Sequence, residues 1–138
     1  MIKYSKQTRT LLAVDCIIFG FDGDTFKILL IKRGFEPEQG NWSLMGGFVE
    51  KEESLDQASN RILKQLTGLE GVYLEQLYTF GDTNRDPIER TVSSAYFALL
   101  DILKYEKQIN LDYHPEWFSL KKVPKLIFDQ KEVLTIIH

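Results

Sequence analysis

Apolar and polar residues alternate along the chain in short blocks that begin with two β-rich segments. Residues 11–21 (LLAVDCIIFGF) and 26–33 (FKILLIKR) are rich in β-branched and other apolar side chains, and the turn-forming sequence DGDT separates them. This pattern predicts a β-hairpin with Gly23 in its turn. Residues 34–41 (GFEPEQGN) are mostly turn formers and predict a loop after the hairpin.

The segment 54–69 (SLDQASNRILKQLTGL) has helical periodicity instead. Ser54 followed three residues later by Gln57 forms a capping-box signature, and Gly68 is a typical helix terminator. The apolar residues between these signals recur at intervals of three and four, which predicts an amphipathic helix with one buried face. Its apolar stripe consists of Leu55, Ala58, Ile62, Leu66 and Leu69.

Most of the remaining chain has the pattern of β-strands. A polar loop at 81–90 (GDTNRDPIER) separates two of them, and a short helix is expected from about Gln130. Because strands outnumber helices and one well-capped helix lies in mid-chain, the predicted class is α+β or a mixed α/β sandwich. The further strands are predicted at 42–44 and 48–49, on either side of Gly46 and Gly47, and at 72–80, 91–103 and 116–120.

Composition limits the class of protein. The 138 residues form one domain by length, and 43% apolar with 27% charged residues is typical of a globular protein. A net charge of −3 gives no electrostatic footprint for nucleic acid. No signal peptide or membrane span is visible, so we expect a cytoplasmic protein. The single cysteine, Cys16, cannot form an internal disulfide, and we expect a buried thiol rather than a reactive one.

The acids are concentrated before the predicted helix. Glu50, Glu52 and Glu53 precede it, whereas no carboxylate lies between Asp56 and Glu70. A Mg²⁺ site for pyrophosphate needs hard oxygen ligands, which a helix can offer at i, i+3 and i+4. The helix body lacks them. The acids before it are either solvated residues favoured by a helix N-terminus or a residual metal site, and we favour the former.

The spacing of several residues around this helix resembles the Nudix box. Gly47 is followed after five residues by Glu53 and then after seven by Arg61, and residues 68–69 (GL) end the motif. The resemblance covers nearly the whole chain. It implies that residues 1–138 form a Nudix-like domain, an α+β fold built as an α/β/α sandwich with a mixed sheet.

The chain departs from the Nudix pattern at the residues that would perform hydrolysis. The resemblance places the three metal-binding glutamates of the family on Ile62, Gln65 and Leu66. Two apolar side chains and one amide are not Mg²⁺ ligands. We therefore expect no catalytic residue, no metal and no cofactor. Glu50 and Glu53 are weak metal candidates, and Glu53 can instead form an ion pair with Arg61.

The stretch 81–100 (GDTNRDPIERTVSSAYFALL) resembles the ADP-ribose pyrophosphatase-like branch of Nudix proteins, and particularly its bacterial transcriptional regulators of the sugar-responsive or NAD-biosynthesis type. The resemblance implies an N-terminal effector-binding domain, with DNA bound only by a C-terminal winged helix outside this chain. Arginines are suited to phosphate, and amide and carboxylate groups to sugar hydroxyls. The expected ligand-binding residues are Trp42, Phe48, Glu50, Asn84, Arg85, Asp86 and Arg90.

Three interpretations remain, and we favour the first. It is a non-catalytic, sugar-sensing domain of a bacterial transcription regulator, a homodimer that binds a sugar or sugar-nucleotide effector and does not bind membranes. The second is a Mg²⁺-dependent Nudix hydrolase of ADP-ribose or another nucleoside diphosphate sugar. The third is an interaction module that keeps the fold only for dimerisation.

Overall fold

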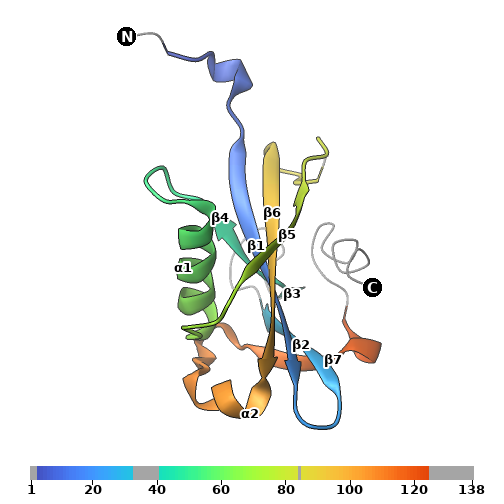
Figure 1. Cartoon of the computed structure of the whole chain (residues 1–138). Helices are drawn as coiled ribbons and strands as arrows, with labels where there is room; N and C mark the ends of the chain where they lie inside the picture. The colour runs from blue at the N-terminus through green and yellow to red at the C-terminus, as the bar shows by residue number, and fades with distance from the viewer. Residues whose placement is uncertain (1–2, 33–40, 84, 125–138) are drawn as a thin grey trace.

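A mixed β-sheet with one long helix organises the chain (Figure 1). The computed structural model describes residues 3–32, 41–83 and 85–124. In chain order the strands and helices are β1 (Leu11–Phe21), β2 (Phe26–Lys32), β3 (Trp42–Ser43), β4 (Met45–Phe48), α1 (Leu55–Thr67), β5 (Glu75–Phe80), β6 (Thr91–Asp101), α2 (Ile102–Tyr105) and β7 (Glu116–Ser119). Short 3₁₀ turns lie at Lys6–Thr8, Glu106–Gln108, Leu111–Tyr113 and Leu120–Lys122.

Strand β1 is the centre of the sheet. It pairs in parallel with β6 along its whole length, from Leu11 opposite Thr91 to Phe21 opposite Asp101. Its other edge is shared by two antiparallel strands, since β4 pairs with the first half of β1 and β2 with its end. The main strand order is β3-β2-β1-β6-β5. This arrangement confirms the predicted α+β class and the mixed sheet.

The predicted hairpin joins β1 to β2. Gly23 has φ +96°, a conformation that glycine adopts without steric cost. The Asp22 side chain accepts hydrogen bonds from the Asp24 and Thr25 amides at 2.9 and 2.8 Å. It also forms an ion pair with Lys27 at 3.0 Å. The Asp22 side chain therefore closes the turn, and the predicted hairpin with Gly23 in its turn is confirmed.

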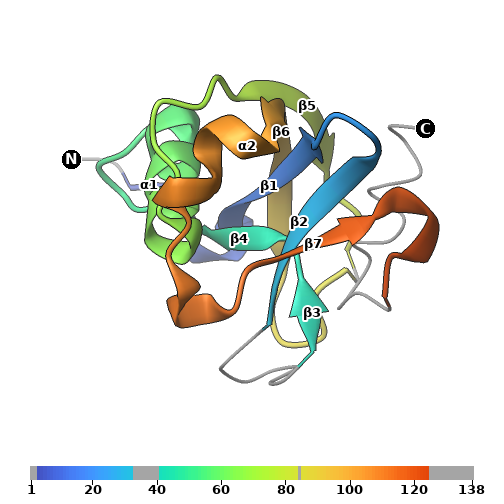
Figure 2. The same ribbon diagram turned by 90° about the horizontal axis from the view of Figure 1, so that it is seen from below.

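Helix α1 has both predicted caps. The Ser54 hydroxyl accepts from the Gln57 amide, the Gln57 side chain accepts from the Ser54 amide, and Gly68 ends the helix with φ +84°. A Cβ at Gly68 would also collide with the Gln108 carbonyl oxygen. Figure 2 shows α1 on one side of the sheet, and β7 joins the sheet as the antiparallel partner of β2.

The core lies on both faces of the sheet because successive strand residues point to opposite sides. Ile17 and Ile18, both fully buried, belong to different clusters. The cluster facing α1 includes Cys16, which is fully buried, so the prediction of a buried cysteine is confirmed. Burial raises the pKa of its thiol. Within the described ranges no helix is both long and apolar enough to cross a membrane.

Some predicted boundaries were wrong. Gly46 and Gly47 lie inside β4 rather than between two strands, because β4 follows the edge of β1 through both glycines. The strand predicted at 72–80 begins only at Glu75, and the one predicted at 91–103 ends at Asp101, where α2 begins. The predicted loop at 34–41 falls mostly, and the helix from about Gln130 entirely, outside the described residues.

Candidate functional site

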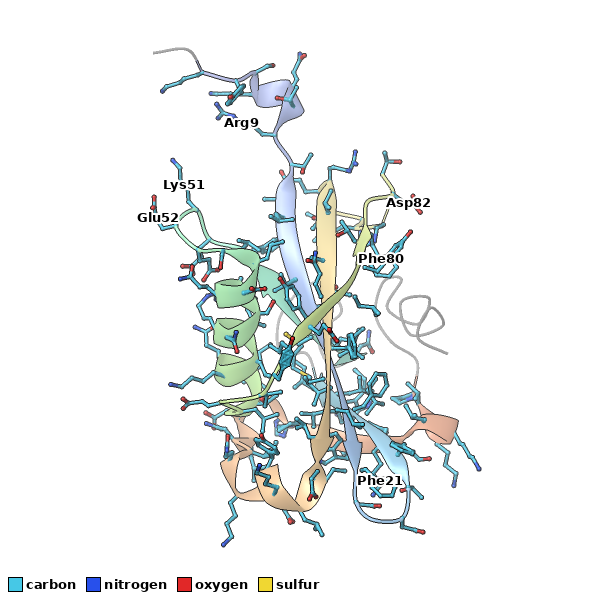
Figure 3. The ribbon with its side chains drawn as sticks, in the orientation of Figure 1. Arg9, Phe21, Lys51, Glu52, Phe80 and Asp82 are labelled. Atoms are coloured by element: carbon cyan, nitrogen blue, oxygen red, sulfur yellow. The ribbon has the colours of Figure 1, made fainter. Side chains whose placement is uncertain are left out.

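Two loops lie at the end of the sheet where β1 and β6 begin. The approach to α1 (residues 49–54) and the β5–β6 connection (residues 81–90) lie on either side of β1 at this end, which is marked by Lys51, Glu52 and Asp82 in Figure 3. The Leu11 amide donates to the Arg90 carbonyl at 3.2 Å, and the Val49 amide donates to the Leu12 carbonyl at 2.8 Å. Backbone hydrogen bonds therefore fix both loops to the first residues of β1.

Arg61 of α1 organises the first loop. Its Nε and Nη2 donate to the two carboxylate oxygens of Glu53 at 2.9 and 2.6 Å, a bidentate pair. Nη2 also donates to the Phe48 carbonyl at 2.9 Å, while the Glu50 amide donates to Glu53 Oε1 at 2.9 Å. One guanidinium therefore ties the end of β4, the loop and the helix together.

This network also determines the charge states. Hydrogen bonds from Arg61 and from the Glu50 amide hold the pKa of Glu53 below its ordinary value. Glu53 is therefore a carboxylate at neutral pH, and its two oxygens already accept from Arg61. The Glu50 carboxylate lies 3.9 Å from Arg61 Nη1 and is largely exposed. The predicted Glu53–Arg61 ion pair is confirmed.

The three metal-ligand positions of the Nudix pattern have other roles here. Ile62 is 3% exposed and packs among buried side chains, and Leu66 is half-buried against the same core. A Cβ on Gly47 would lie 2.9 Å from Ile62 Cδ1, so Ile62 fills the space beside the glycine strand. Gln65 is exposed and accepts from Arg61 Nη1 at 3.2 Å.

The arrangement of possible metal ligands can be judged for the described residues. Among the residues described, no group of three or more His, Cys, Asp or Glu could hold a metal ion. The arrangement can bind and orient a polar ligand through carboxylate, guanidinium and backbone groups. Its nearest acids, Glu50 and Glu53, both lie against Arg61.

The second loop holds its arginines against the backbone. Arg85 donates to the Phe80 carbonyl at 3.3 Å and lies over the Phe80 ring, 5.4 Å from its centroid. Arg90 Nη2 donates to the Gly81 carbonyl at 3.0 Å. Asp86 accepts from the Ile88 amide at 2.8 Å, so its carboxylate builds the turn. The predicted ligand residue Asn84 lies outside the described residues.

The two predicted aromatic contacts have different surroundings. Phe48 is 52% exposed at the end of β4, where its carbonyl binds Arg61. Trp42 is half-buried, and its ring packs edge-on against Phe118 of β7 with centroids 4.7 Å apart. The structure thus leaves Phe48 open to a ligand, whereas the Trp42 ring is used in packing.

Sequence reasoning missed one link between the sheet and α1. The Tyr96 hydroxyl on β6 donates to Asp56 in the first turn of α1 at 2.7 Å. Burial, and secondarily the Asp56 carboxylate, raises the pKa of Tyr96 to about 12. The two residues are 40 positions apart, so periodicity could not pair them. The acid in the first turn was the only sequence signal, and it indicates a helix N-terminus alone.

Sequence comparison shows which known proteins this chain resembles. The NUDIX domain profile matches residues 9–135. The ADPR responsive transcriptional repressor NtrR of Acinetobacter baylyi is 38% identical over 128 residues, which are 90% of this chain and 51% of that protein. The ADP-ribose pyrophosphatase of Methanocaldococcus jannaschii is 35% identical over 133 residues, which are 96% of this chain and 75% of that protein.

The fold has a close counterpart among solved structures. The NUDIX domain of Shewanella oneidensis NrtR complexed with ADP ribose superimposes with a TM-score of 0.81 at 30% identity, covering 96% of this chain and 90% of that one. This chain spans about half the length of the A. baylyi repressor. The profile match covers most of the chain and includes the glycine strand, α1 and both loops. The chain belongs to the Nudix family.

Proposed function

We propose that this chain is a non-catalytic, effector-sensing Nudix domain of a bacterial transcriptional regulator, and that its effector is ADP-ribose or a closely related sugar nucleotide. The observation that carries the proposal is the burial of Ile62 against Gly47, at a position where a hydrolase would hold metal. The similarity to an ADPR responsive repressor and to an NrtR domain complexed with ADP ribose supports the choice of ligand.

The hydrolase alternative has weaker support. Its remaining candidate ligands are Glu50 and Glu53, and Glu53 gives both oxygens to Arg61. A metal there would compete with a bidentate, charge-assisted pair that also holds the loop. The similarity to an ADP-ribose pyrophosphatase keeps this alternative testable.

The test is calorimetric titration of ADP-ribose in EDTA and again in Mg²⁺, with chromatography of the products. We expect binding in both buffers and no AMP. At about 100 times Kd, the ligand should stabilise the fold by about 2.7 kcal/mol. Mg²⁺-dependent cleavage that Glu53→Gln abolishes would establish the hydrolase instead. Absence of binding in both buffers would favour the interaction module.

Two exposed aromatic residues provide a test of where the ligand binds. Phe48→Ala should weaken ADP-ribose binding because Phe48, 52% exposed, lies beside the first loop. Tyr73→Ala is the matched control, since Tyr73 is 74% exposed and precedes β5, away from both loops. Equal effects of the two substitutions would contradict the placement of the ligand.

The proposal also includes partners. We infer a homodimer in the cytoplasm, with DNA bound through a domain outside this chain, because two-fold dimers match palindromic operators. Sedimentation equilibrium of this chain tests the dimer, and a monomer at micromolar concentration would contradict it.

A further inference from the structure

The chain begins with a basic arm, residues 3–10, that stands away from the sheet beyond the start of β1 (Figure 1). All of its residues are exposed, and Tyr4 is 87% exposed. Its hydrogen bonds are local: Ser5 caps the turn at Lys6–Thr8, Arg9 Nη2 donates to the Tyr4 carbonyl at 3.2 Å, and Thr10 Oγ1 donates to the carbonyl of the next residue, Leu11, at 3.5 Å. The arm therefore has its own local structure and adds nothing to the described core.

The charge of the arm is opposite to that of the chain as a whole. It contains Lys3, Lys6 and Arg9, and no acid occurs before Asp15, although 20 acids outnumber 17 lysines and arginines overall. Within the described part of the chain, none of these three cations forms an ion pair. Three solvated positive charges are thus held on a segment with no packing role.

The root of the arm lies at the candidate site. The amide of Leu11, two residues after Arg9, donates to the Arg90 carbonyl of the second loop. The Leu12 carbonyl accepts from the amide of Val49, the first residue of the first loop. Thr10 is the exposed link between the arm and these anchors. These anchors place the root of the arm between the two loops, and Figure 3 shows Arg9 above both.

The negative charge of a diphosphate bound at this end of the sheet must be balanced by positively charged groups. In hydrolases and other phosphoryl-transfer sites, divalent metal ions neutralise much of it. Here Arg61 is committed to Glu53, and Arg85 and Arg90 already donate to backbone carbonyls. Glu50 and Glu52 add negative charge to the first loop. Among the described residues, no ion pair uses the three cations of the arm or Lys51 of the first loop, so the arm adds three charges to that one.

We infer that residues 3–10 fold over the diphosphate of the bound nucleotide, and that Lys3, Lys6 and Arg9 supply the positive charge that metal supplies in a hydrolase. This inference rests on the proposed function, because it assumes a diphosphate ligand. The inference places the phosphates of that ligand near the start of β1, where the arm is attached. It also makes binding metal-independent but dependent on ionic strength.

The test compares two triple variants by calorimetric titration with ADP-ribose in EDTA. The arm variant is Lys3→Gln, Lys6→Gln and Arg9→Gln. The control, Lys107→Gln, Lys121→Gln and Lys122→Gln, removes the same charge from exposed positions in other turns. At low salt the arm variant should bind about tenfold more weakly than wild type, from roughly 0.5 kcal/mol for each exposed pair.

Salt provides a second measurement. Raising the ionic strength should weaken wild-type and control binding, and should affect the arm variant less. Equal losses in both triple variants would show a general charge effect and overturn the inference, as would unchanged affinity in the arm variant. Absence of ADP-ribose binding by the wild type would overturn the proposed function as well, so the two failures are distinguishable. Thermal melting should show both variants folded, because the substituted side chains are exposed.

Discussion

Ile62→Glu should destabilise the domain by about 3–5 kcal/mol, although it restores an acid to the Nudix pattern. Ile62 is 3% exposed and packs with Val14, Ala58 and Tyr96. Burying an isoleucine side chain stabilises by about 1.5–3 kcal/mol, which the substitution forfeits. The new carboxylate must also be desolvated or take up a proton, which adds a cost of a few kcal/mol. The total is a large part of a typical stability of about 5–15 kcal/mol.

Urea unfolding at pH 7 measures this loss, and Gln65→Glu is the matched control. Gln65 is exposed on the same helix, so its change should stay within about 0.5 kcal/mol. Burial raises the pKa of the Glu introduced at 62 in the folded state. The penalty should therefore grow as the pH rises above about 4.3, the unfolded pKa of Glu, and shrink below it. A loss under about 1 kcal/mol at pH 7 would refute the burial argument.

Three other substitutions test the contacts around α1. Tyr96→Phe should cost about 1 kcal/mol in urea unfolding through its hydrogen bond to Asp56. Because the folded pKa of Tyr96 is raised to about 12, its contribution should be complete below pH 10 and lost as the pH rises towards 12, and a pH-independent difference would contradict this. Gly68→Ala should cost more than Gly71→Ala, since both glycines have positive φ but only Gly68 also faces a carbonyl; equal melting temperatures would contradict this. Glu53→Gln should lower the melting temperature by a few degrees at pH 7, and the difference should vanish as the pH falls through the depressed pKa of Glu53; a constant difference would contradict the ion pair.

Local sequence signals predicted the elements that are stabilised locally. The hairpin around Gly23 and helix α1 with its caps at Ser54 and Gly68 depend on side chains close in sequence, and the structure confirms both. Strand ends were less predictable. The prediction that the strand starts at residue 72 was wrong, because apolar side chains such as Val72 pack against the core facing α1 without joining the sheet. Hydrophobicity alone does not separate these two uses of an apolar residue.

The site was predictable only as far as the motif frame extends. Spacing predicted the Glu53–Arg61 pair, but not that the same guanidinium would bind the Phe48 carbonyl. It also did not predict the Tyr96–Asp56 contact, because tertiary structure brings these residues together. Trp42 and Phe48 were equal candidates in the sequence, and only the packing of Trp42 on Phe118 distinguishes them.

The retained and altered positions of the Nudix frame differ in their physical roles. Gly47 leaves room for a side chain of α1, Gly68 ends the helix in a left-handed conformation, and Arg61 with Glu53 holds the loop. None of these roles requires a metal. At the positions where the family binds its metal, Ile62 is apolar and packed in the core, and the Gln65 side chain accepts a hydrogen bond from Arg61. Because Ile62 belongs to the core, an acid cannot be placed there without also rebuilding that packing. The described site is thus a folded scaffold whose loops are held without a metal, which is what the proposed effector-sensing domain, one that binds its ligand without consuming it, needs.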